Sequence, residues 1–182
     1  MQTRAQLRQR GFSLFELVAV VVVIAILALV LLKFGTDYAE EAEKTAMEQV
    51  LSSTRAALHL RVAGMIAHNQ YDAIPRLAEQ NPMDWMSDKP PIYAGTIYGV
   101  APRELAPTRS WYYDSRAKEL VYRAQRTRHL LMPRNAENEI RFKIYVEQGT
   151  LPGGEEFAKP LRGMRRAEIA AVEPYQWSIS TP

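Results

Sequence analysis

The sequence contains no cysteine, and this absence excludes several kinds of chemistry at once. Without cysteine there is no disulfide, no thiolate nucleophile and no cysteine-ligated zinc. The three histidines, His59, His68 and His129, are too scattered to form a metal-ligand pattern. The sequence also has no phosphate-binding loop, nucleophile elbow or metal-binding motif. We therefore expect no catalytic residue, no metal, no cofactor and no enzymatic activity.

The chain also lacks a large excess of positive charge once the residues before Gly11 are left out. The chain has 23 basic and 20 acidic residues, and three of the basic ones, Arg4, Arg8 and Arg10, precede Gly11 with no acidic residue among them. The remainder has 20 residues of each sign and is formally neutral. A basic surface of the kind that binds nucleic acid is therefore not indicated, and we expect no nucleic-acid partner.

Proline and glycine are absent from Phe12 to Phe34, where the chain is most apolar. All sixteen residues from Leu17 to Leu32 are apolar. As a helix, the stretch from Phe12 to Leu32 spans ~32 Å, close to the ~30 Å hydrocarbon core of a bilayer. The length and hydrophobicity of this run argue against a core helix. No small-x-small cleavage site follows it, which favours a retained membrane anchor over a cleaved secretory signal.

One acidic residue, Glu16, lies at the start of this apolar segment. A carboxylate near the centre of a membrane helix costs about 2.5–3.5 kcal/mol on insertion scales, and less near an end of the helix. The three preceding arginines predict that the N-terminus stays in the cytoplasm while the rest of the chain is exported. An ordinary membrane anchor accounts for these arginines but not for Glu16.

The stretch GFSLFELVAVVVVIAIL, from Gly11 to Leu27, resembles the class III signal of type IV pilins and type II secretion pseudopilins. That signal is a short basic leader ending in glycine, then Phe, Ser or Thr, Leu, an apolar residue, Glu and a long apolar helix. The resemblance implies that prepilin peptidase cleaves between Gly11 and Phe12 and methylates the new amine of Phe12, using S-adenosylmethionine. It also implies that Glu16 pairs with the amine of a neighbouring subunit during assembly.

The resemblance implies partners and a location too. The partners would be prepilin peptidase, other pilin or pseudopilin subunits, an inner-membrane assembly platform and the lipid bilayer. The chain would cross the inner membrane once, with a cytoplasmic N-terminus and a periplasmic C-terminal domain, before it enters a pilus or pseudopilus. Residues 1–11 would be the leader that is removed, residues 12–34 the transmembrane and assembly helix, and residues 35–182 the globular domain.

Three features that major pilins commonly carry are missing. Lys33 stands near the position of their usual helix-breaking proline, Ala25 stands where they often have glycine, and no C-terminal disulfide loop can form. These absences favour a minor pilin or a pseudopilin. An alternative also remains open: a membrane-anchored periplasmic binding module or enzyme whose N-terminus only imitates the class III signal.

Beyond Gly35 the pattern predicts an amphipathic helix from about residue 37 to residue 68, which either continues the anchor or is separated from it by a bend or break at Gly35. Its apolar stripe, expected to pack on a sheet, consists of Met47, Leu51, Thr54, Leu58, Val62 and Met65. The helix also carries an acidic cluster, namely Asp37, Glu40, Glu41, Glu43 and Glu48. This cluster is interpreted as a solvated face or, less simply, as a docking surface for later basic residues of another subunit, namely Arg116, Lys118, Arg123, Arg126 and Arg128.

The rest of the chain predicts a small antiparallel sheet. A hairpin is expected at 110–113 and 119–124, and a half-buried strand at 139–147 with Ile140, Phe142, Ile144 and Val146 toward the core. A short helix is expected near 76–80, a loop or edge strand at 89–102, a turn-rich loop at 150–160, and a final strand or two at 167–180, interrupted by Pro174. The predicted fold is α+β and pilin-like: a long N-terminal helix packed on a small antiparallel sheet.

Overall fold

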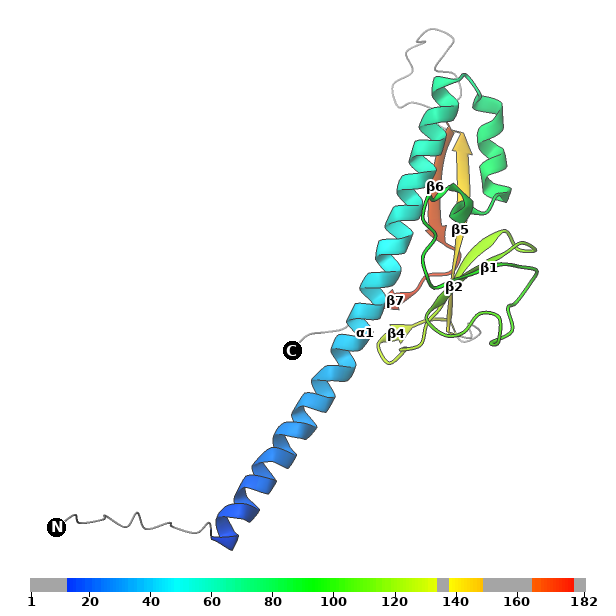
Figure 1. Ribbon diagram of the computed structural model, residues 1–182. Coiled ribbons are helices and arrows are strands. Elements are labelled where there is room, and N and C mark those ends of the chain that lie inside the picture. The colour runs from blue at the N-terminus through cyan, green and yellow to red at the C-terminus, as the bar shows by residue number, and fades with distance from the viewer. Residues whose placement is uncertain (1–12, 134–137, 149–164, 179–182) are drawn as a thin grey trace, which may run out of the picture. The chain divides into compact units, whose positions relative to one another are not determined.

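The computed structural model describes residues 13–133, 138–148 and 165–178. The chain divides into two compact units, Met1–Ala39 and Glu40–Pro182. Helix α1, Leu14–Ala67, begins in the first unit and ends in the second (Figure 1). Gly35 lies inside α1, so this glycine does not end the helix.

Among its described residues, the second unit has one sheet of five strands and one of two strands. The larger sheet has the order β1-β2-β3-β5-β6, and the smaller one pairs β4 with β7. The strands are β1 (Tyr93–Ile97), β2 (Ser110–Asp114), β3 (Glu119–Arg123), β4 (Leu130–Leu131), β5 (Glu139–Gln148), β6 (Arg165–Ala171) and β7 (Gln176–Trp177). Two 3-10 helices, η1 (Tyr71–Glu79) and η2 (Pro82–Trp85), connect α1 to β1. This is the α+β, pilin-like layout that the sequence predicts.

The predicted hairpin is confirmed as β2 and β3, which pair antiparallel with Trp111 opposite Tyr122. Asp114 fixes the turn between them, because its Oδ1 accepts hydrogen bonds from the backbone N–H groups of Arg116 (2.9 Å) and Ala117 (3.2 Å). An aspartate that binds the backbone two residues further on is a common turn-forming device. The turn is therefore set by local side-chain chemistry.

The expectation of a purely antiparallel sheet is wrong at one edge, because β1 runs parallel to β2. The connection from residue 98 to residue 109 carries the chain back, so that β2 starts in the same direction as β1. The pairing is irregular between Tyr93 and Thr96, and Gly95 lies between them with φ +102°, a conformation that L side chains rarely adopt. Of the two alternatives that the sequence leaves open for residues 89–102, a loop or an edge strand, the structure has the edge strand at Tyr93–Ile97. The sequence does not predict the direction of this strand.

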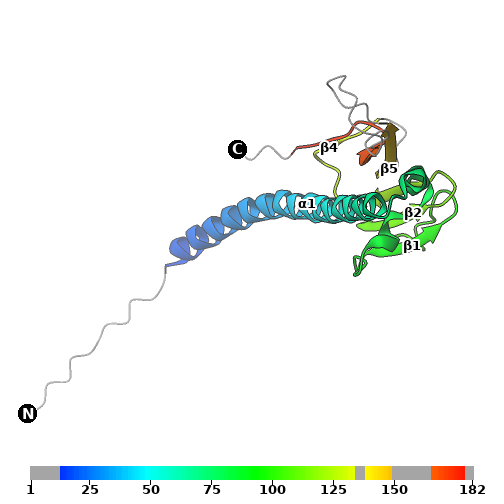
Figure 2. The same cartoon turned by 90° about the horizontal axis from the view of Figure 1, so that it is seen from above.

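The apolar stripe of α1 packs on the larger sheet, as predicted. Figure 2 shows the C-terminal part of α1 running beside the larger sheet. Met47, Leu51, Thr54 and Leu58 are buried, and Val62 and Met65 are partly buried against the same core. The stripe forms a single cluster with Trp111, Tyr122 and Phe142 of the sheet. The rings of Trp111 and Tyr122 lie 4.9 Å apart, within the range of favourable aromatic pairs.

The remaining expectations from the sequence are mostly confirmed. On β5, Ile140, Phe142 and Ile144 are buried, while Arg141 and Lys143 on the other face are partly exposed. The short helix expected near 76–80 lies largely within the longer η1, and two strands, β6 and β7, flank the position of Pro174. The loop expected at 150–160 lies outside the described residues.

Candidate functional site

The start of α1 is capped by Ser13, and the cap involves Glu16. The Ser13 Oγ accepts a hydrogen bond from the backbone N–H of Glu16 (3.2 Å), and the Ser13 carbonyl accepts one from the N–H of Leu17 (3.1 Å). A serine at this position satisfies N–H groups that the first helical turn leaves free. Glu16 thus lies in the first turn, where the positive end of the helix dipole favours a carboxylate.

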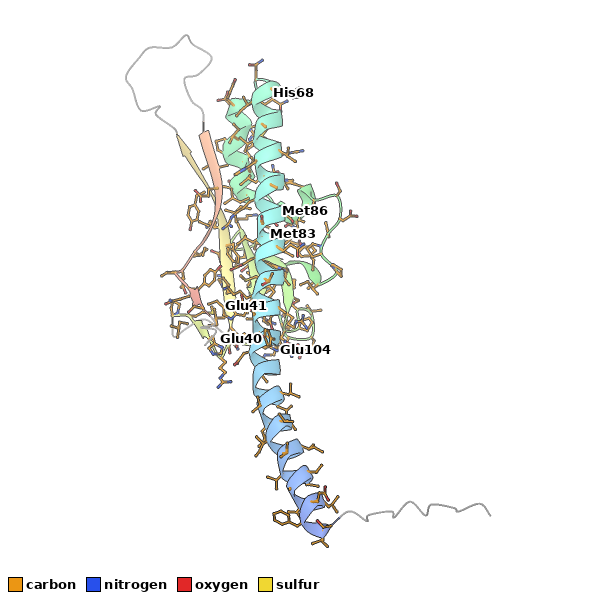
Figure 3. The ribbon with its side chains drawn as sticks, turned by 90° about the vertical axis from the view of Figure 1, so that its left-hand side faces the viewer. Glu40, Glu41, His68, Met83, Met86 and Glu104 are labelled. Atoms are coloured by element: carbon orange, nitrogen blue, oxygen red, sulfur yellow. The ribbon has the colours of Figure 1, made fainter. Side chains whose placement is uncertain are left out.

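The part of α1 that follows, from Leu17 to Leu32, is apolar on all sides. Every residue from Leu17 to Leu32 is exposed (Figure 3). By length and composition, α1 is sufficient to cross a membrane, and none of its most apolar window is buried. Monomeric soluble proteins rarely expose a continuous apolar surface of this size, so this part of α1 requires lipid or other protein around it.

The two residues predicted to form the cleavage and methylation site, Gly11 and Phe12, lie outside the described residues. Glu16 is the only one of the three predicted site residues that the structure describes, and it sits one turn beyond Phe12 in the sequence. The roles of Gly11, Phe12 and Glu16 stay predictions from the sequence.

Comparison with protein families gives a match at the start of the chain. Residues 6–32 match the model of the prokaryotic N-terminal methylation motif. The chain carries the signal of type IV pilins and pseudopilins. The match covers the leader, the predicted cleavage site, Glu16 and the apolar helix up to Leu32. Comparisons with curated proteins and with solved structures give no match.

Two carboxylates that precede the apolar stripe of α1 form a second polar site, entirely within the second unit. Glu40 is 2% exposed and accepts three hydrogen bonds at its two oxygens. Its Oε1 accepts from the backbone N–H of His129 (2.9 Å) and the indole Nε1–H of Trp177 (3.0 Å), and its Oε2 lies 3.0 Å from His129 Nδ1. Glu40 therefore joins α1 to the segments that form the small β4–β7 sheet.

Glu43, one turn further along α1, is 1% exposed and has its own three partners. Its Oε1 accepts from the Tyr122 hydroxyl (3.2 Å) and the Gln125 N–H (2.7 Å), and its Oε2 pairs with Arg126 Nη1 (3.2 Å). A buried carboxylate is tolerated only where such partners replace the lost water. We name Glu40 and Glu43 together the carboxylate clamp, because each connects α1 to the segment that follows β3.

The interpretation of the acidic cluster as one solvated or subunit-docking face is therefore wrong for the clamp. Glu40 and Glu43 are buried, whereas Glu48 is exposed and Glu41 pairs with Lys44 on the same helix. Two of the proposed basic partners are also used within the chain, since Arg126 binds Glu43 and Arg123 binds Glu139. The sequence does contain a signal for this burial. Glu40, Glu43, Met47 and Leu51 follow one another at intervals of three and four residues, so the clamp residues lie on the same helix face as the apolar stripe.

The clamp predicts a specific acid sensitivity. Burial alone raises the pKa of Glu40, but the hydrogen bonds from His129 and Trp177 outweigh it and lower the pKa below its ordinary value of 4.5. A lowered pKa in the folded state gives stability that is present above the unfolded-state pKa and is lost as the pH falls through the folded-state pKa. We expect the urea midpoint of the full chain in detergent to fall as the pH drops below about 4.5, and to fall less in Glu40→Gln than in the wild type. Glu41→Gln serves as the matched control, and an acid limb in Glu40→Gln as steep as that of the wild type would contradict the assignment.

A third polar group lies on the face of the sheet opposite α1. Arg123 and Glu139 are buried and joined by bonds from Arg123 Nε (3.1 Å) and Nη2 (2.6 Å) to Glu139 Oε1. The Tyr112 hydroxyl donates to the same oxygen (3.1 Å). Burial, followed by the charge of Glu139, raises the pKa of Tyr112 to about 12, so the phenol keeps its proton and donates. Arg141 Nη2 binds the other oxygen of Glu139 at 2.8 Å.

The histidines are not brought together. His129 binds Glu40, His68 Nδ1 lies 2.7 Å from the carbonyl of Gly64, and His59 is exposed on α1. Within residues 13–133, 138–148 and 165–178, no three His, Asp or Glu side chains are grouped so that they could hold a metal ion. The polar groups described above, the carboxylate clamp and the Arg123–Glu139 pair, thus connect helices, strands and loops of the second unit to one another.

Proposed function

We propose that this chain is a structural subunit, a minor pilin or a pseudopilin, of a type IV pilus-like fibre or a type II secretion pseudopilus. The observation that carries the proposal is the coincidence of two features in one segment. The methylation motif at residues 6–32 overlaps the start of α1, which carries Glu16 in its first turn and exposes every residue from Leu17 to Leu32. The α+β unit attached to this helix fits a pilin-like subunit.

In this account prepilin peptidase removes residues 1–11 at the cytoplasmic face of the inner membrane and methylates Phe12. Lipid covers the apolar helix until the assembly platform moves the subunit into the fibre, where the helices of other subunits replace the lipid. Glu16 then pairs with the amine at Phe12 of a neighbour, so that two charges that are costly in an apolar environment offset each other. The globular unit lies in the periplasm. The role is one of assembly, and no catalytic step is assigned to the chain.

Cleavage at the proposed site is tested by enlarging the residue before it. Glycine leaves its peptide bond open to a protease cleft because it has no side chain. We expect Gly11→Val to leave most of the precursor uncut, which a gel of the full chain detects as the larger form. Gln9→Val, in the same leader, serves as the control and should be processed normally. Normal processing of Gly11→Val would contradict the proposed cleavage between Gly11 and Phe12.

A further inference from the structure

The connection from β1 to β2 contains one hydrogen-bonded turn, Pro102–Ala106, whose middle residues are exposed while its ends pack on the sheet. The backbone N–H groups of Leu105 and Ala106 both donate to the Pro102 carbonyl, at 3.1 and 3.0 Å. Ala101 and Ala106, at the two ends of this turn, are buried against Tyr112 and Val121. Between them Arg103, Glu104 and Leu105 are exposed. We name Pro102–Ala106 the projecting turn.

The buried ion pair of the sheet holds the projecting turn from beneath. Arg123 donates from Nη2 to the Ala101 carbonyl (2.7 Å) and from Nη1 to the Ala106 carbonyl, so one guanidinium binds both ends of the turn. Its remaining bonds go to Glu139. A buried ion pair adds little net stability compared with apolar packing, and its clearest contribution is to select one conformation. Here it fixes the shape in which the turn is presented.

The outward side of the projecting turn combines an apolar and an acidic side chain. Leu105 is 61% exposed, and Tyr98 and Val100 nearby on the same connection are also exposed. Glu104 makes no ion pair within the part of the chain that the structure describes. Contiguous exposed apolar residues on a rigid support are typical of a protein-binding surface.

A cleft elsewhere on the second unit has the complementary character. It has a volume of about 580 Å³ and is lined by Ala57, Leu60 and Arg61 of α1 and by Gln80, Asp84 and Trp85 of the η1–η2 region. Leu60 is 75% exposed and so presents an apolar side chain at the cleft. Asp84 pairs with Lys89 (2.6 Å), whereas Arg61 has no acidic partner among the described residues.

We propose that the projecting turn of one copy of this chain docks into the cleft of a second copy, with Leu105 against Leu60 and Trp85 and with Glu104 paired to Arg61. The charges are complementary, and each surface offers an apolar side chain beside its charge. This inference rests on the proposed function, since it describes contacts between subunits of a fibre.

The positions of the two surfaces favour an open chain of copies over a closed dimer. Figure 3 shows Glu104 at the level of Glu40 and Glu41 on α1, whereas the cleft is formed by residues 57–61 of the same helix. The contact therefore joins two different patches, and copies joined in this way are displaced along α1. Contacts between unlike patches that do not close into a ring produce filaments.

The absence of cysteine allows a direct test by crosslinking. In cells that produce the full chain with its assembly machinery, we expect Leu60→Cys combined with Leu105→Cys to give a ladder of disulfide-linked multimers after mild oxidation. A disulfide requires Cα atoms within about 7 Å, so it reports a specific contact. Leu60→Cys combined with Leu131→Cys is the matched control, since Leu131 is 64% exposed but lies outside the projecting turn. An equal ladder in the control, or no ladder in the test pair, overturns the docking.

Charge reversal gives a second, independent readout. Arg61→Glu or Glu104→Arg alone should reduce the crosslinked fraction about fivefold, and the two together should restore it. The control is the double variant Arg103→Glu with Arg61→Glu, in which the residue beside Glu104 is changed. This double variant should not restore the crosslinked fraction. If crosslinking fails while assembly still depends on Glu16, the docking is wrong and the proposed function stands. If the wild-type chain is itself absent from the fibre fraction, the proposed function fails.

Discussion

Replacing Glu16 by alanine is expected to abolish incorporation of the chain into a fibre while leaving its membrane insertion and leader cleavage intact. In the assembled state the amine at Phe12 of a neighbouring subunit would lose the carboxylate that neutralises it in an apolar environment. Removing one partner of a buried charge pair costs about 3–5 kcal/mol. That corresponds to a loss of roughly a hundredfold or more in the assembly equilibrium. Insertion should not suffer, because the change removes a charge from the apolar segment.

The measurement compares the chain in the sheared or purified fibre fraction with the chain in the membrane fraction. Glu48→Ala is the matched control, since Glu48 is an exposed glutamate on the same helix and is not part of the motif at residues 6–32. Unchanged incorporation of Glu16→Ala would show that this residue does not drive assembly. Absence of the wild-type chain itself from the fibre fraction would contradict the subunit role and favour the alternative, an anchored periplasmic binding module or enzyme.

Replacing Glu43 by alanine is expected to cause a large loss of stability of the second unit. The substitution leaves the Tyr122 hydroxyl, the Gln125 N–H and the Arg126 guanidinium without their common acceptor. Loss of one partner from a buried charged network costs about 3–5 kcal/mol, a large part of the 5–15 kcal/mol that stabilises a typical domain. Chemical unfolding of the full chain in detergent, followed by tryptophan fluorescence, measures the change.

The neighbouring Glu41 provides the control for this experiment. It belongs to the same acidic stretch, but among the described residues it pairs with Lys44 alone, at 3.7 Å on the helix surface. Glu41→Ala should therefore change the free energy of unfolding by less than about 0.5 kcal/mol. Equal effects of Glu41→Ala and Glu43→Ala would mean that the carboxylate clamp does not hold α1 to the sheet.

Elements defined by local periodicity are the ones that the sequence predicts well. The spacing of Met47, Leu51 and Leu58 identifies the buried face of α1, because a helix repeats every 3.6 residues. The alternation on β5 and the turn residues between β2 and β3 identify their strands in the same way. Each of these signals lies within about twenty residues of sequence.

Features that depend on distant residues are the ones that the sequence does not reveal. Glu40 is stabilised by His129 and by Trp177, which are 89 and 137 positions away in the sequence. Its partners are one backbone N–H and two ring nitrogens, which do not form a sequence motif. In the sequence, Arg123 resembles a surface cation, but in the structure it is buried and donates hydrogen bonds to the β1–β2 connection. The parallel direction of β1 depends on the path of that same connection, which no local pattern fixes.

The candidate assembly site shows the opposite case. Gly11, Phe12 and Glu16 are identified by a short motif whose spacing is itself the signal, and the family match covers the same residues. The structure adds the Ser13 cap, which places Glu16 in the first helical turn. Fold and assembly site are thus predicted from different information: periodicity for the fold, and a contiguous recognition sequence for the site.

The central claim is that the N-terminus is a processed assembly signal, and intact-mass analysis of the chain purified from membranes tests it most directly. The account predicts a mature protein that starts at Phe12 and carries one methyl group on its N-terminal amine. An intact Met1, or a mature start far from Phe12, would contradict it.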